Sequence, residues 1–109
     1  MAVGLGAFGA HGLKARLSTE MLAVWHTAVQ YHAWHALGLL AIGLSPDTGW
    51  TRGAGLFLIA GTVLFSGSLY ALALGAPRAV GAVTPLGGAA FILGWLAFAV
   101  GAIYARTPA

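Results

Sequence analysis

Histidines are the residues of this 109-residue chain best suited to chemistry. His32 and His35 lie three positions apart, within about 60° of each other on a helix, so both side chains could reach one point. His11 ends the first apolar stretch and could meet them in space. Such imidazoles can ligate zinc, copper or haem iron, or relay protons near pH ~6.5. The alternative is structural hydrogen bonding, which we favour because no cysteine and no carboxylate except Glu20 accompanies them.

Hydroxyl groups are the other candidates for chemistry. In the segment LFSGSLY, Ser66 and Ser68 lie on opposite sides of a helix, with Gly67 between them. A nucleophilic serine needs a base and an acid, and this chain lacks such a pair. We therefore expect the two hydroxyls to bond carbonyl groups of their own or a neighbouring helix. The sequence predicts no enzyme, no catalytic residue and no bound cofactor.

The glycines of GLGAFGAHG, residues 4–12, raise a further alternative. Gly4, Gly6 and Gly9 have the G-x-G-x-x-G spacing of dinucleotide-binding loops. That motif must follow a buried strand and open a helix within a βαβ unit. Only three residues precede Gly4, and no α/β alternation follows. A nucleotide-binding loop is therefore rejected.

Composition indicates the environment in which these residues must work. The chain is 60% hydrophobic and only 6% charged, whereas soluble domains carry roughly 25% charged residues. Two acidic and five basic side chains cannot coat a soluble particle of this size, so lipid must surround most of the surface. The basic residues form no run, which excludes a nucleic-acid partner. The lipid bilayer is the first expected partner.

Four apolar segments predict an all-α, small polytopic membrane four-helix bundle in one domain, residues 1–109. The helices are expected at about 1–13, 18–44, 50–74 and 84–105, separated by turn-forming residues. Thr84 is expected to cap the fourth helix and Pro85 to occupy its first position. The last two segments reach the roughly 20 residues that a bilayer span needs, and they carry no charge from Gly53 to Leu74 and from Thr84 until Arg106.

The first two helices are expected to differ from the others. Thirteen residues give a helix of about 20 Å, which is shorter than the roughly 30 Å hydrocarbon core. The first helix is therefore short, or truncated relative to a true start upstream. The second is expected to begin as an interfacial amphipathic helix and to continue into the membrane. Trp25, Tyr31 and Trp34 in its first half suit the headgroup region.

Polar residues at membrane depth are costly, so each indicates a role or a partner. We expect one polar cluster, made of His11, Gln30, Tyr31, His35, Ser66, Ser68, Tyr70 and Thr84. Small residues at four-residue spacing instead indicate surfaces for close helix packing. They form the strips Ala2-Gly6-Ala10, Gly67-Ala71-Gly75, Ala90-Gly94 and Ala97-Gly101-Ala105. The packing residues expected are Gly6, Gly9, Ala10, Gly67, Ala71, Gly87, Gly94 and Gly101.

The chain contains four characteristic motifs, which occur in the order GAFGAHG, YHAWHALGLL, LFSGSLYALAL and TPLGGAAFILGW. In them the chain resembles the small uncharacterised membrane protein family called domain of unknown function 423. The resemblance implies a compact four-helix protein of the bacterial inner (plasma) membrane and implies no activity. It matches at His11, Tyr31, His35, Ser66, Ser68, Tyr70, Thr84 and Pro85. His32 departs from it, because relatives often carry glutamine there, and relatives have about ten or more further apolar residues before GAFGAH.

Three functions therefore stay open. The favoured one is a structural or interaction role, in which the helices pack with a second copy or with another membrane protein. The second is a metal, haem or proton site built on His11 and His35, with His32 as a third candidate. The third is a minimal transporter or channel subunit. The near absence of charge in the apolar segments argues against this third function.

Overall fold

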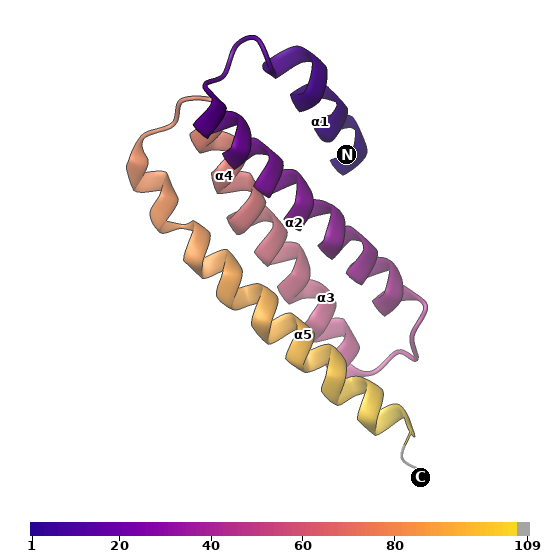
Figure 1. The fold of residues 1–109 in the computed structure, drawn as a ribbon. Helices are drawn as coiled ribbons and strands as arrows, with labels where there is room; N and C mark the ends of the chain where they lie inside the picture. Colours follow the sequence, from indigo (N-terminus) through magenta and orange to yellow (C-terminus); the bar gives the residue numbers. More distant parts are fainter. Residues whose placement is uncertain (107–109) are drawn as a thin grey trace.

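The computed structural model describes residues 1–106, and every regular element in that range is helical (Figure 1). The elements are α1 (Ala2–Phe8), the π-helical turn η1 (Gly9–Leu13), α2 (Thr19–Gly43), α3 (Gly49–Gly61), the π-helical turn η2 (Thr62–Ser66), α4 (Gly67–Ala73), the 3₁₀ turn η3 (Arg78–Ala82) and α5 (Thr84–Arg106). Because α1 runs into η1, and α3 runs through η2 into α4, these elements make four helices. The all-α, four-helix prediction is confirmed, and each helix begins and ends within a residue of its expected bounds.

Short polar side chains cap the N-termini of two of the helices. The Ser18 hydroxyl accepts a hydrogen bond from the Met21 amide at 3.1 Å and caps α2. Thr48 and Thr51 form a reciprocal capping box at the start of α3. In this box the Thr51 amide donates to Thr48 Oγ1 at 3.1 Å, and the Thr48 amide donates to Thr51 Oγ1 at 2.8 Å.

The end of α4 requires a glycine. Gly75 has a φ of 106°, in the left-handed region, and its amide donates to the Leu72 carbonyl at 3.1 Å. The Ala76 amide donates to the Ala71 carbonyl at 2.9 Å, which completes a Schellman motif before Pro77. Gly75 therefore ends a helix, and does not form part of the packing strip expected from Gly67 and Ala71.

The helices lie side by side in a flattened layer of 57 × 27 × 14 Å between Cα atoms. The α3–α4 helix lies between α2 and α5, and α1 packs on the first half of α2 (Figure 1). This thin arrangement leaves large apolar side chains uncovered, including Leu37, Leu56, Val63, Ile92 and Leu96. Such exposure is costly in water and favourable in hydrocarbon.

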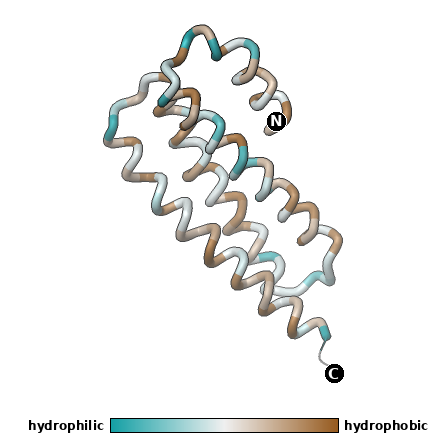
Figure 2. The backbone as a smooth tube through the Cα atoms, viewed as in Figure 1, coloured by the Kyte–Doolittle hydropathy of each residue, from teal (hydrophilic) through white to brown (hydrophobic). Residues whose placement is uncertain are grey.

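Two helical segments, 49–73 and 78–106, are long and apolar enough to cross a bilayer. Figure 2 shows hydrophilic residues in the first half of α2 and mainly hydrophobic residues in its second half, the pattern expected for a helix that starts at the interface. The segment 2–13 is apolar but shorter than a span. The two expected spanning segments are therefore the two that meet the length and hydropathy requirements.

Trp25 corrects one expectation about the interface. Its side chain is only 3% exposed, and it packs with Leu13 and Ala73 in the core beneath α1. The indole nitrogen donates to the Leu5 carbonyl at 3.0 Å, so Trp25 joins α1 to α2 and does not face headgroups. Trp34 is 53% exposed and remains suited to the lipid surface. Two tryptophans on one helix thus have different environments because they project from different sides of it.

Five of the expected packing residues lie against another helix. Gly6 of α1 and Gly9 of η1 lie against Val29 and Trp25 of α2. On α5, Gly94 and Gly101 lie against α3, and a Cβ added at Gly87 would collide with the backbone nitrogen of Phe65 in η2. The three α5 glycines thus lie in the contact between α5 and the central α3–α4 helix.

The other three expected packing residues lie elsewhere. Gly67 and Ala10 are exposed, and nothing lies within 4 Å of a Cβ added at Gly67. Ala71 is half-buried. Gly67 therefore makes no close helix contact within residues 1–106.

Candidate functional site

His35 is buried between α2 and α5, with 5% of its surface exposed. Its Nδ1 lies 2.6 Å from the Tyr31 carbonyl oxygen, and the Trp95 indole nitrogen donates to its Nε2 at 3.1 Å. A carbonyl only accepts and an indole only donates, so the imidazole is neutral and carries its proton on Nδ1. Both ring nitrogens are engaged by the protein, and neither offers a free lone pair to a metal ion.

Aromatic rings surround the His35 imidazole. It stacks on Phe91 of α5, with ring centroids 3.5 Å apart and planes 10° apart. Tyr31 of α2 lies against Phe65 of η2, with centroids 4.4 Å apart. Together with Trp95 these rings line a groove of about 660 Å³, whose α5 wall also carries Pro85, Gly88 and Ala89. We call this recess the aromatic groove and define it by Tyr31, His35, Phe65, Gly88, Phe91 and Trp95.

His32 lies in a different environment from His35. Its Nδ1 is 3.0 Å from the Tyr70 hydroxyl of α4, and the Tyr70 ring packs against Trp25 with centroids 4.7 Å apart. His11 is exposed on η1. The helical spacing of His32 and His35 suggested a shared target, but each bonds a different helix. Within residues 1–106, no three histidine, aspartate or glutamate side chains come together as a metal-binding group.

The hydroxyl-bearing residues form separate pairs. Ser66 of η2 donates to the Ala28 carbonyl of α2 at 2.8 Å. Ser68 of α4 lies 2.5 Å from the Thr84 hydroxyl of α5 and also donates to the Phe65 carbonyl at 2.9 Å. Thr84 is the first residue of α5 instead of its cap, since the Gly87 amide already bonds the Val83 carbonyl, and the Thr84 hydroxyl bonds Ser68 across the helix interface. Pro85 is accordingly the second residue of that helix.

The expected single polar cluster is therefore divided among three helix interfaces. His35 bonds Tyr31 at one contact, Ser66 bonds α2 at a second, and Ser68 pairs with Thr84 at a third. Tyr70 pairs with His32. Gln30 and His11 are exposed. In the described part of the chain, no buried side-chain nitrogen or oxygen lacks a hydrogen-bond partner. The arrangement holds helices together and leaves no buried polar atom waiting for a ligand.

The π-helical turn η2 explains how these contacts coexist. A π turn inserts an extra residue into an α-helix and rotates the residues that follow it. At this point Ser66 reaches α2, while the backbone of Phe65 lies against Gly87 of α5. The motif LFSGSLY therefore serves contacts on both sides of the central helix.

Sequence reasoning missed Phe65, Phe91 and Trp95 as parts of the site. Aromatic residues within apolar segments are ordinarily assigned to lipid contact, and nothing in their spacing indicates a partner. Trp95 carried the one usable signal. It lies in the interior of the fourth apolar segment, whereas tryptophans in contact with headgroups gather near the ends of spans.

Comparison with known proteins matches most of the chain. Residues 5–88 match the family model described as protein of unknown function (DUF423). The chain is 50% identical over 107 residues to the UPF0382 membrane protein YwdK of Bacillus subtilis, covering 94% of this chain and 87% of that protein. It is 52% identical over 106 residues to the UPF0382 membrane protein SSP2132 of Staphylococcus saprophyticus, covering 93% and 86%. No solved structure matches.

Proposed function

This chain belongs to the DUF423 family of integral membrane proteins of unknown function, and we propose that it is a non-catalytic interaction protein. In this proposal it packs within the bilayer against a second copy of itself or against another membrane protein. The aromatic groove between α2 and α5 receives the partner helix. The open groove is the observation that carries the proposal.

The buried polar side chains are hydrogen-bonded within the protein, which supports a role without catalysis. His35 uses both ring nitrogens inside the protein, and Ser66, Ser68 and Thr84 bond neighbouring helices or each other. A nucleophile or general base must be free to reach a substrate. Charged side chains are all exposed in the described residues, so no charged path crosses the protomer either.

The distribution of glycines supports the groove as the contact surface. Gly87, Gly94 and Gly101 are already used in the contact of α5 with the central helix. Gly88 is different, because nothing lies within 4 Å of a Cβ added there, and it lies on the groove wall beside Ala89. Small residues at that position let the backbone of an incoming helix approach closely, which is how helices associate in lipid.

Cysteine crosslinking in membranes tests this proposal directly. The chain contains no cysteine, so Gly88→Cys introduces a single thiol at the groove wall. Gly67→Cys is the matched control, since Gly67 also has nothing within 4 Å of its added Cβ but does not line the groove. Under a mild oxidant we expect a dimer band from Gly88→Cys and a monomer from Gly67→Cys, because a disulfide needs Cα atoms within about 7 Å.

The other results of this experiment are also informative. A crosslinked band of a different mass, seen only with Gly88→Cys, would identify another membrane protein as the partner of the groove. Monomeric Gly88→Cys at native expression, together with a dimer of Gly67→Cys, would overturn the groove as the contact surface.

A further inference from the structure

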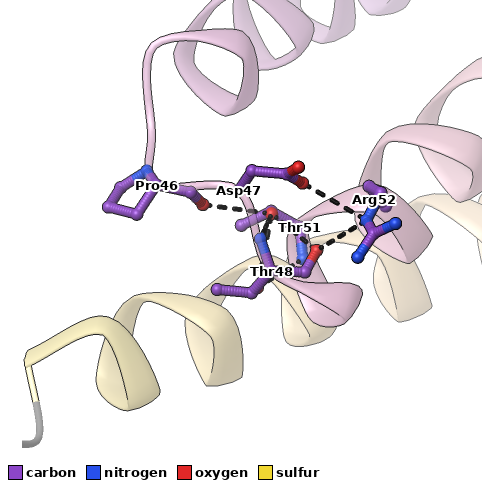
Figure 3. Close-up of polar contacts among 5 residues, drawn as sticks. All are labelled: Pro46, Asp47, Thr48, Thr51 and Arg52. Carbon is purple, nitrogen blue, oxygen red and sulfur yellow. Dashed lines mark hydrogen bonds and ion pairs between the residues drawn. The ribbon is translucent and has the colours of Figure 1, made fainter.

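Asp47, in the connection between α2 and α3, forms an ion pair with Arg52 in the first turn of α3 (Figure 3). Arg52 Nε lies 3.2 Å from Asp47 Oδ1 and 3.5 Å from the Thr48 carbonyl oxygen. Thr51 Oγ1 donates to the Pro46 carbonyl at 3.2 Å, which ties the loop to the first turn of α3. The two charged side chains are 72% and 76% exposed. The loop and the first turn of α3 thus place a carboxylate and a guanidinium side by side, both exposed.

The position of this pair is at the end of a membrane-spanning segment. Arg52 lies in the first turn of the segment 49–73, which is long and apolar enough to cross the bilayer. Charged residues at such ends lie at the level of the lipid headgroups. The pair therefore meets phosphate and amine groups before it meets hydrocarbon.

An apolar groove begins at the same pair. A recess of about 340 Å³ runs from Asp47 and Arg52 along α2 and α3, between Ile42, Leu56 and Ile59. Gly55 leaves this groove open, because a Cβ added there would meet only the Ile42 side chain, at 4.0 Å. The groove therefore combines a charged entrance with walls suited to a hydrocarbon chain.

We propose that this groove binds a phospholipid whose headgroup carries a primary ammonium, of the phosphatidylethanolamine class. The phosphate lies on Arg52, whose terminal guanidinium nitrogens remain as donors beyond the Nε contact to Asp47. The ammonium lies on the Asp47 carboxylate, and one acyl chain follows Ile42, Leu56 and Ile59.

Charge complementarity selects this class over the other common headgroups. The Asp47 and Arg52 charges are adjacent and cancel, so they match a headgroup that also carries both signs. An anionic headgroup would place its negative charge beside Asp47 without compensation. A choline headgroup is zwitterionic, but its methylated nitrogen has no hydrogen to donate to the carboxylate.

Lipid retention by the full chain tests the proposal. The protein in detergent is offered an equimolar mixture of palmitoyl-oleoyl phosphatidylethanolamine, phosphatidylcholine and phosphatidylglycerol, and bound lipid is counted by native mass spectrometry. We expect phosphatidylethanolamine to be retained about threefold over each of the others, the effect of one exposed ion pair. A preference for phosphatidylglycerol, or equal retention of all three lipids, would overturn the proposal.

Two substitutions test the ammonium contact and the phosphate contact of the headgroup separately. Asp47→Asn removes the ammonium partner, and we expect phosphatidylethanolamine retention to fall to the level of phosphatidylcholine. Arg52→Gln removes the phosphate partner, and retention of all three lipids should fall. Arg78→Gln is the matched control, because it removes one positive charge from η3, away from the groove. An unchanged lipid preference in Asp47→Asn would contradict the role of the carboxylate.

Filling the groove tests the acyl-chain contact separately. Gly55→Leu places a side chain in the open space between α2 and α3, and we expect it to reduce retention of all three lipids. Gly67→Leu adds the same side chain at an exposed position of the same helix, outside the groove, and should leave retention unchanged. Equal retention by both leucine variants, each folded by circular dichroism, would overturn the proposed path of the acyl chain.

Discussion

Trp95 of α5 donates a hydrogen bond of 3.1 Å from its indole nitrogen to Nε2 of His35 on α2. The two helices lie on opposite sides of α3–α4, so this bond and the stacking of His35 on Phe91 link them directly across the central helix. The same bond fixes the imidazole as neutral and closes its second nitrogen to other partners. A histidine that could have carried chemistry therefore holds the flattened layer together.

A double-mutant cycle measures the strength of this link. His35→Phe and Trp95→Phe each remove one side of the hydrogen bond while keeping an aromatic ring. We expect each to lower the free energy of unfolding, with a coupling of about 0.6 kcal/mol, the average that double-mutant cycles give for hydrogen bonds between membrane helices. Unfolding by SDS titration in mixed micelles gives the four free energies. Additive effects of the two substitutions would contradict the bond.

Neighbouring glycines on α5 provide a sharp test of helix packing. A Cβ at Gly87 collides with the Phe65 backbone, whereas a Cβ at Gly88 meets nothing within 4 Å. Gly87→Ala should therefore lower the free energy of unfolding by about 1–3 kcal/mol, because backbone atoms must move apart. Gly88→Ala should be neutral or slightly stabilising, since alanine favours the helix. Equal thermal stability of both variants in detergent would show that α5 does not approach η2 at Gly87.

Trp25 is expected to hold α1 on α2. Trp25→Phe keeps a buried ring but loses the 3.0 Å bond to the Leu5 carbonyl. Losing one such bond of about 1 kcal/mol should raise hydrogen exchange of residues 2–13 about fivefold and leave α5 unchanged. Trp34→Phe is the control on the same helix, because Trp34 is exposed and bonds no other helix in the described contacts. Hydrogen–deuterium exchange with mass spectrometry follows both; unchanged exchange in Trp25→Phe would contradict the docking role.

The engagement of both His35 nitrogens predicts weak metal binding. Added Zn²⁺ should not raise the thermal stability of the detergent-solubilised protein, and His35→Phe should not change its response to the metal. Binding of an ion to the folded state alone would raise stability by about 2.7 kcal/mol at a hundredfold excess over its Kd. A zinc-dependent rise that disappears in His35→Phe would show that the imidazole leaves Trp95 to bind the ion.

The positions of the helices could be predicted from the sequence because they depend on residues close together in the chain. The turn cluster at residues 45–49, the Gly75 stop and the uncharged run after Thr84 are short-range signals, and the helices follow them within a residue. The contacts of the candidate site were harder to predict from the sequence. His32 and His35 share a face by spacing, yet one bonds Tyr70 and the other Trp95. Spacing places residues on a helix but does not say which neighbouring helix each one meets.

Composition and hydropathy alone placed this protein in the membrane and divided it into four helices, because burial in hydrocarbon and helix termination depend on residues close together in the chain. The tertiary structure decided how each face is used. It turned Trp25 inward, left Gly67 open and set Gly87 against Phe65. A small residue or an aromatic ring has the same local pattern whether it faces lipid or another helix. Only the order and rotation of the packed helices, which depend on the shapes of all side chains together, distinguish the two.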